Sequence, residues 1–178
     1  MPRWTIDPDH SVAEFSIRYL TIAHVRGIFG KIDGTIEFDP SNPAGASVEA
    51  RIDVKSIRTG NEKRDGHLAT GDFFDTAKYP EIIFKGTGAE PIGGSRFRLF
   101  GDLTMHGVTR PVKLDCESAG PVKIPEAIGG ETSIGFVCAT SLNREEFGMT
   151  WGLMPMQGGT MLAREVQVSL EIEADLQE

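Results

Sequence analysis

Residues 96–116 read RFRLFGDLTMHGVTRPVKLDC, and apolar and polar side chains alternate along most of this stretch. Successive side chains of a β-strand point to opposite faces, so apolar residues at every second position share one face. The residues on that apolar face are Phe97, Leu99, Leu103, Met105, Val112, Leu114 and Cys116. The stretch therefore predicts two half-buried strands.

The same alternation recurs along nearly the whole chain, and helical spacing is almost absent. Further strands are predicted within residues 13–19, 28–38, 48–54, 82–85, 134–138 and 166–174. About eight half-buried strands without intervening helices indicate an antiparallel sandwich or barrel, because a parallel sheet needs crossover helices. No repeat or linker divides the 178 residues, so we expect a single all-β domain over residues 1–178.

One segment interrupts the alternation. Residues 58–72 are polar and irregular, with enough length for only a helical turn or two, and Phe73 and Phe74 follow directly. Two adjacent aromatic side chains must pack beneath this segment or line an opening. We expect the segment 58–74 to form a short helical or irregular element that caps or gates one mouth of the barrel.

Composition and charge exclude several classes of function. The chain has 18 Lys and Arg against 26 Asp and Glu, a net charge of −8, which disfavours binding to nucleic acids. No apolar run approaches the roughly 20 residues of a membrane span, so no stable membrane insertion is expected. The first residues lack the apolar stretch of a secretory signal, and two cysteines are too few for a disulfide framework. These features predict a cytoplasmic protein.

The predicted inner face contains several small residues, namely Gly30, Gly34, Ala50, Gly101 and Ala174. Unfilled volume destabilises a solid core but is useful in a cavity. An eight-stranded barrel is about the size that either fills itself or holds one small ligand. The phenylalanines on apolar strand positions therefore have two interpretations that stay open, core packing or the lining of a channel. They are Phe15, Phe84, Phe97 and Phe136.

Four separated stretches resemble the YceI-like family of lipid-binding proteins. They are WTIDPDHS at 4–11 with Phe15, RDGHL at 64–68 running into DFFD at 72–75 and Tyr79-Pro80, GDLTMHGVT at 101–109 with Pro111-Val112, and Asn143-Arg144 with Phe147-Gly148. They occur in the family's order, and the resemblance covers essentially residues 3–176. Met105 stands where the family usually has Ile or Leu, a harmless exchange for a buried side chain.

The resemblance implies an antiparallel, lipocalin-like, extended barrel that binds a polyisoprenoid or another long-chain amphiphile in an internal apolar channel. Binding, transport or storage of that ligand would be noncatalytic and would need no cofactor. Family members are often dimeric, so a homodimer is one expected arrangement, and many are periplasmic. The residues expected to contact the ligand are Phe15, Ile17, Phe73, Phe74, Phe84, Phe97, Leu99, Gly101 and Phe136, with Arg64 and His67 as polar contacts.

The basic cluster Arg58, Lys63 and Arg64 has two interpretations. Arginine can hold a diphosphate or carboxylate headgroup through two parallel hydrogen bonds. The cluster also has acidic neighbours, Glu62 and Asp65, and is equally compatible with a solvated loop. Both readings stay open.

Three histidines lie in the family-like stretches, His10, His67 and His106. No two of them have the spacing of metal ligands, so hydrogen bonds that join a turn to a neighbouring strand are favoured over a metal site or acid–base catalysis. Two other classes of function stay open. One is an enzyme that acts on a bound isoprenoid quinone or lipid through His67 or His106, and the other is a stress-related protein-interaction module.

The two cysteines lie in consecutive predicted strands, separated by a connection centred near residue 126. Hairpin pairing about that connection places Cys116 and Cys138 nearly opposite each other, both on the apolar face. Directly opposite residues have Cβ atoms about 4.5–5.5 Å apart, beyond the usual disulfide spacing. We therefore predict two adjacent, buried and unbridged thiols.

Overall fold

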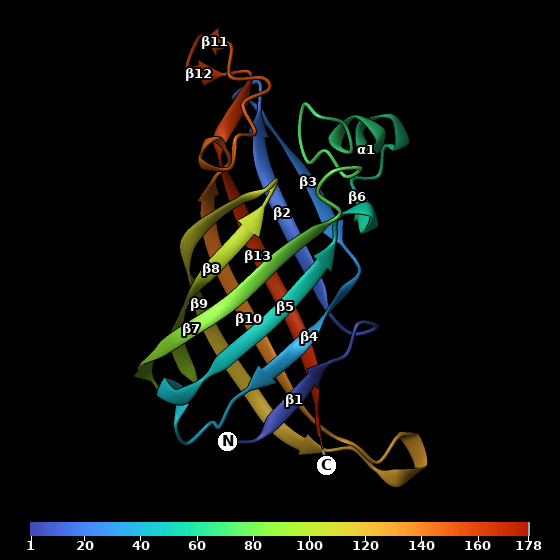
Figure 1. Cartoon of the computed structure of the whole chain (residues 1–178), viewed down its shortest axis with the longest axis vertical. Coiled ribbons are helices and arrows are strands. Elements are labelled where there is room, and N and C mark those ends of the chain that lie inside the picture. The colour runs from blue at the N-terminus through green and yellow to red at the C-terminus, as the bar shows by residue number, and fades with distance from the viewer. Residues whose placement is uncertain (178) are drawn as a thin grey trace.

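The computed structural model describes residues 1–177, which form a chain built almost entirely of β-strands (Figure 1). The strands are β1 (Arg3–Ile6), β2 (Val12–Tyr19), β3 (Ala23–Phe29), β4 (Ile32–Glu37), β5 (Ser47–Asp53), β6 (Ile57–Arg58), β7 (Glu81–Gly93), β8 (Arg96–Met105), β9 (Val108–Lys123), β10 (Thr132–Asn143), β11 (Pro155–Met156), β12 (Gly159–Thr160) and β13 (Leu162–Leu176). Between them lie the helix α1 (Glu62–Leu68) and the 3-10 turns η1 (Pro43–Gly45), η2 (Val54–Ser56), η3 (Glu126–Ile128) and η4 (Arg144–Phe147). Within residues 1–177, no helix has both the length and the apolar character to span a membrane.

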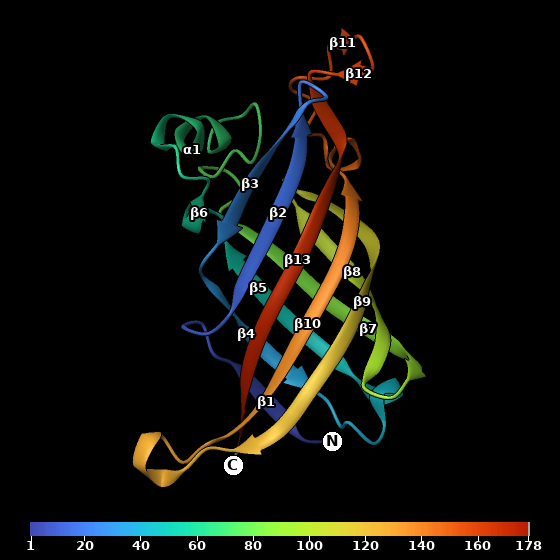
Figure 2. The ribbon, with the colours of Figure 1, turned by 180° about the vertical axis from the view of Figure 1, so that it is seen from behind.

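The strands close into an antiparallel eight-stranded barrel, seen from two sides in Figures 1 and 2. Three positions in the wall are each occupied by two strands that follow one another in the chain: β1 with β2, β3 with β4, and β5 with β6. The strands β7, β8, β9, β10 and β13 complete the order around the barrel. β13 closes the circle by pairing with β2, where Val168 lies opposite Phe15, and with β1, where Leu176 lies opposite Trp4. The predicted fold class is confirmed.

Alternation along the strands sorts side chains between the interior and the surface. On β13, the residues that face the interior are Val166, Val168, Leu170 and Ile172, each two positions from the next. Between them, Gln167 and Glu171 lie on the opposite face of the strand. The apolar positions predicted for this strand are therefore its inner positions.

Cys116 and Cys138 occupy directly opposed positions on β9 and β10, and both are free and buried. Both side chains face the interior of the barrel. A hydrogen bond with Cys116, together with burial, raises the pKa of the Cys138 thiol, which therefore stays protonated. The predicted cross-strand pair of unbridged thiols is confirmed.

Aromatic side chains close one end of the barrel. The ring centroid of Phe38 lies 5.1 Å from the ring centroid of Phe97 and 5.1 Å from that of Phe136. All three rings are buried. The indole Nε1 of Trp4 donates a hydrogen bond of 2.9 Å to the Phe38 carbonyl oxygen. We call this group the aromatic floor; it lies toward the end where Figure 1 marks the N-terminus.

Two excursions from the barrel lie at the opposite end, residues 59–80 with α1 and residues 148–161 with β11 and β12 (Figure 1). The helix begins at Glu62 because the Asn61 side-chain oxygen accepts a hydrogen bond of 2.9 Å from the Arg64 backbone N–H. Beyond the helix, the backbone N–H of Phe74 donates to the Leu68 carbonyl at 3.0 Å and holds the following turn. The segment 58–74 is thus short and partly helical, as predicted.

Candidate ligand-binding site

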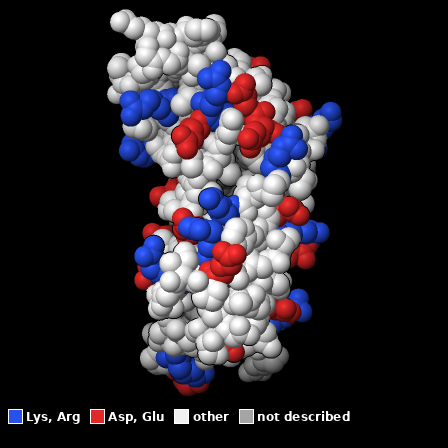
Figure 3. Space-filling model, turned by 90° about the vertical axis from the view of Figure 1, so that its left-hand side faces the viewer, with Lys and Arg blue, Asp and Glu red and all other residues white. Residues whose placement is uncertain are grey.

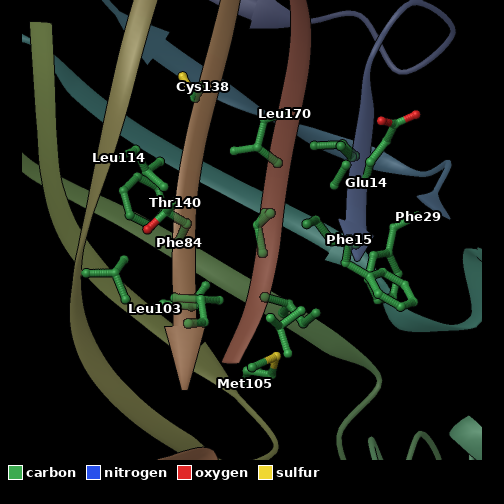
Figure 4. Close-up of a pocket in the computed structure, with 18 of the residues that line it drawn as sticks. Glu14, Phe15, Phe29, Phe84, Leu103, Met105, Leu114, Cys138, Thr140 and Leu170 are labelled. Atoms are coloured by element: carbon green, nitrogen blue, oxygen red, sulfur yellow. The ribbon is translucent and has the colours of Figure 1, made fainter. Parts of the chain in front are cut away.

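A cavity of about 480 Å³ occupies the interior of the barrel. Figure 4 shows side chains of several strands, among them Leu103, Leu114 and Leu170, around this interior space. Most of the lining is aliphatic or aromatic, and its charged or hydrogen-bonding side chains include Glu14, Arg64, His67, Thr140 and Arg144. An interior of this kind favours apolar ligands, because few of its side chains can replace the hydrogen bonds that a polar ligand makes with water.

The cavity is long and narrow. On β13 it extends from Leu162 to Ile172. Ten residue steps of about 3.4 Å, tilted by about 40° to the axis as in most barrels, correspond to roughly 25 Å along the barrel. A volume of about 480 Å³ spread over that length describes an elongated channel rather than a round chamber. The dimensions fit one hydrocarbon chain.

The cavity opens at the end opposite the aromatic floor. Lining residues near the floor, such as Ile36 and Phe38, are buried, whereas Tyr19 and Trp151 are exposed by 37% and 38%. The side chain of His67, which also lines the cavity, is 38% exposed. We call this open end the mouth; Tyr19, Arg64, His67 and Trp151 surround it.

Ten of the eleven residues predicted to contact a ligand lie in the wall of this cavity. They are Phe15, Ile17, Arg64, His67, Phe73, Phe74, Phe84, Phe97, Leu99 and Phe136. The structure brings them together although they come from four strands, β2, β7, β8 and β10, and from the segment 59–80. Their contact with a ligand stays a prediction.

The expectation that Gly101 lines the cavity is wrong. A Cβ atom at this position would lie 2.5 Å from the Lys85 carbonyl oxygen and 2.5 Å from Cζ of the Phe84 ring. The missing side chain therefore makes room for the ring of Phe84, and it is this ring that faces the cavity. A leucine at position 101 would collide with the β7 backbone instead of filling the channel.

The wider expectation that small inner residues create the cavity holds only for Ala50, which lines it. Gly30 lies in an open bend with no atom near its Cβ position, and Gly34 adopts a φ of +150° against the backbone of β5. Ala174 is fully buried in packed surroundings near the floor. The cavity arises because the side chains of a barrel this size do not meet at its axis.

Replacing Gly101 by alanine is expected to lower the free energy of unfolding by about 1–3 kcal/mol, because the new methyl group overlaps the Lys85 carbonyl and the Phe84 ring. Gly88→Ala in the same hairpin is the matched control, since its Cβ position has no atom within 4 Å. Urea unfolding of both variants measures the difference. Equal midpoints for the two variants would contradict the close approach at residue 101.

An aromatic cluster links the two excursions at the mouth. The ring of His67 meets Phe73 at 5.1 Å and Trp151 at 4.8 Å, both nearly edge to face, and Phe73 meets Trp151 at 5.3 Å. The imidazole Nε2 donates a hydrogen bond of 2.8 Å to the Asp72 carboxylate. His67 thus holds the segment 59–80 against the loop 148–161. Its position agrees with the predicted cap, and gating by this segment stays a prediction.

Arg64 is the basic residue of the predicted cluster that reaches the cavity. Its guanidinium donates hydrogen bonds of 2.8 Å to the side-chain and the backbone oxygen of Thr59. The Thr59 N–H and hydroxyl donate in turn to the Asp65 carboxylate, at 2.9 and 2.6 Å. Arg58 and Lys63 do not line the cavity. Of these three basic residues, Arg64 is the one placed to meet a polar group at the mouth.

Sequence reasoning missed the structural importance of Arg144. This buried guanidinium donates four hydrogen bonds to backbone carbonyls, at 2.7 Å to Ala163, 2.9 Å to Met149, 2.7 Å to Trp151 and 3.0 Å to Leu162. Burial lowers the pKa of the guanidinium, which nevertheless remains charged. A signal was present, because position 144 continues the inward alternation of 134–142. Trp151, in an irregular loop, gave no such signal.

Residues 4–174 match the YceI-like domain family. The chain belongs to the YceI-like family. A UPF0312 protein of Staphylococcus aureus is 33% identical over 178 residues, the full length of both chains.

Solved structures share the YceI-like fold. BcnA of Burkholderia cenocepacia superposes with a TM-score of 0.81 at 23% identity, over 94% of this chain and 98% of BcnA. A polyisoprenoid-binding domain from Saccharophagus degradans superposes with a TM-score of 0.72 at 15% identity, over 98% of each chain. Both comparisons show similarity of fold.

Two further histidines of the YceI-like stretches have structural contacts outside the cavity. His106 donates from Nδ1 to the Phe147 carbonyl at 2.9 Å, which joins the turn after β8 to η4. His10 donates from Nδ1 to Asp7 at 2.6 Å, and this bond raises the pKa of His10 and lowers the pKa of Asp7. The His106 bond joins a turn to a distant element, as the predicted bridging role requires, whereas the His10 bond stays within the turn between β1 and β2.

Asp7, His10 and Glu173 also form a group whose ligand atoms lie within 4.8 Å of one another, close enough for a metal ion. The His10 side chain is 65% exposed, and its Nδ1 is held by Asp7. Nearby, the Asp7 N–H donates to the Glu173 carbonyl at 2.9 Å, and the Glu173 N–H donates to the Ser11 hydroxyl at 3.1 Å. These bonds, made by the backbone and by the Ser11 hydroxyl, join the passage from β1 to β2 to its partner strand β13.

Proposed function

We propose that the protein binds, and carries or stores, one long-chain amphiphile without transforming it, and that a polyisoprenoid is the first ligand class to test. The observation that carries the proposal is the apolar cavity of about 480 Å³ that runs from the mouth to the aromatic floor. Burial of apolar surface supplies affinity at roughly 25 cal/mol per Å², before the costs of ordering the ligand. The polyisoprenoid-binding domain of the same fold supports the choice of ligand class.

In this proposal the tail lies along the barrel axis and the headgroup stays at the mouth. The floor is closed by Phe38, Phe97 and Phe136, so the tail enters from the other end. At the mouth, Arg64 and His67 offer the polar contacts for the headgroup. The two free thiols agree with a reducing compartment, and we propose the cytoplasm as the location.

The affinity for isoprenoid alcohols is expected to rise with chain length, from geraniol to longer homologues, and to level off when the tail fills the channel. The reason is that each added isoprene unit buries further apolar surface until no lining remains free. Titration calorimetry, with each alcohol delivered from cyclodextrin, measures the series. An affinity that is independent of chain length would contradict a ligand lying along the axis.

A further inference from the structure

One stretch of the chain beside the mouth is uncharged. From Phe147 to Ala163 the chain contains no Asp, Glu, Lys, Arg or His, although a quarter of all residues are charged. Figure 3 shows charges of both signs over the body of the molecule and none at the upper end of the view, the end at which Figure 1 draws β11 and β12. We call this end, formed by residues 19–22 and 149–161, the apolar tip.

Large apolar side chains are exposed on the apolar tip. Ile22 is 85% exposed, Met154 59%, Met156 44% and Trp151 38%. The two loops that carry them are joined, because the Leu20 N–H donates a hydrogen bond of 2.8 Å to the Met161 carbonyl. Single exposed apolar residues are ordinary, whereas a group of four on two adjoining loops marks an interaction surface.

The apolar tip is continuous with the cavity. Tyr19 and Trp151 belong to the tip and also line the mouth, and Leu162 directly follows the second loop and lines the cavity. Arg144 holds that loop in place through the carbonyls of Met149 and Trp151. Any binding partner that contacts the tip therefore lies directly at the entrance of the cavity.

We propose that the apolar tip docks on the surface of a lipid bilayer, so that the ligand passes between membrane and cavity without crossing water. Ile22, Trp151, Met154 and Met156 would enter the interfacial region, where tryptophan is favoured because one end of its ring system is apolar and the other polar. The passage of ligand rests on the proposed function, whereas the docking rests on the tip alone.

The charge distribution specifies the kind of bilayer. A body of net charge −8 is repelled by anionic headgroups, and the tip contributes no cation to offset this. At the base of the tip, Arg18 donates to the Thr21 carbonyl at 2.8 Å, and Arg164 is paired with Glu145 at 2.7 Å. Arg18 keeps its charge there, because a hydrogen bond to a carbonyl does not neutralise a guanidinium, but the tip itself meets the bilayer with apolar side chains. Docking is therefore mainly apolar and is expected on zwitterionic phosphatidylcholine.

Flotation of the whole chain with phosphatidylcholine vesicles tests the docking. The wild type is expected to float with the vesicles, and Ile22→Asp combined with Met154→Asp to reduce the partition coefficient at least about tenfold, because two exposed apolar contacts are lost. The matched control is Ile92→Asp combined with Ile128→Asp, exposed residues at the other end of the molecule, which is expected to float like the wild type.

Tryptophan fluorescence gives a second readout. The chain has two tryptophans, and Trp4 is buried at the floor, so a blue shift on adding vesicles and quenching by brominated lipid report Trp151. Absence of both signals, or equal flotation of the tip variant and the wild type, would overturn the docking. Self-association of the wild type without vesicles, abolished in the tip variant, would assign the tip to a second copy of the chain and also overturn it.

Binding of a long isoprenoid alcohol delivered from cyclodextrin separates this proposal from the proposed function. The tip variant is expected to bind the alcohol like the wild type, since the substituted side chains do not line the cavity. Alcohol binding without vesicle binding would overturn the docking and leave the proposed function standing. Vesicle binding without alcohol binding would overturn the proposed function and leave the docking standing.

Discussion

Replacing Arg144 by methionine is expected to lower the free energy of unfolding by about 3–5 kcal/mol, or to detach the loop 148–163 at a comparable cost. The four carbonyls that accept from the guanidinium lie in that loop and at the start of β13. A thioether can donate to none of them. Arg144→Lys is expected to lose most of the same stability, because an ammonium group cannot reproduce the planar fork of donors.

Arg164→Met is the matched control for this prediction. Arg164 lies on the surface and pairs with Glu145 at 2.7 Å, and exposed pairs of this kind stabilise by no more than about 1 kcal/mol. Urea unfolding measures global stability, and amide hydrogen exchange over residues 148–163 detects local detachment. If Arg144→Met is no less stable than Arg164→Met and its loop exchanges at the wild-type rate, the buried guanidinium does not hold the mouth together.

Replacing Ala50 by phenylalanine is expected to weaken binding of a long isoprenoid alcohol roughly fifty- to hundredfold. Ala50 lines the cavity on β5, and a benzyl group there would exclude about 100 Å² of ligand contact, equivalent to about 2.5 kcal/mol. The cavity offers the ring empty volume, so cooperative unfolding is expected to persist. Titration calorimetry measures the affinity, and Leu170→Trp provides a second block from β13.

Ala139→Phe supplies the control for the blocked cavity. Ala139 lies between two inward residues of β10, is exposed, and does not line the cavity. This variant is expected to bind the alcohol with wild-type affinity. Wild-type binding by folded Ala50→Phe and Leu170→Trp proteins would show that the ligand lies outside the barrel.

The strands and their inner faces could be predicted from the sequence because strand alternation is a local property. A half-buried strand must place its apolar residues on one face, so the pattern of β13 already identified Val168 and Leu170 as inner residues. The same reasoning paired Cys116 with Cys138, since the position of a hairpin connection determines which residues face each other.

Gly101 is a residue whose surroundings the local pattern could not predict. Its position in the alternation correctly placed it toward the interior, yet what occupies that part of the interior depends on the Phe84 ring from the neighbouring strand. The residues of a strand are enough to predict which of its faces points inward. Which side chains fill the space in front of that face depends on the rest of the barrel.

By itself, then, the sequence determined an antiparallel barrel, its inner positions and most of the residues that line its interior. Only the tertiary structure decided that the interior is a channel open at one end, that Arg144 holds the loop of Trp151 there, and that Ile22 meets that loop in one apolar tip. The physical reason is that side chains in irregular loops follow no repeating pattern of inward and outward positions. Their positions follow from hydrogen bonds and contacts between residues that lie far apart in the chain.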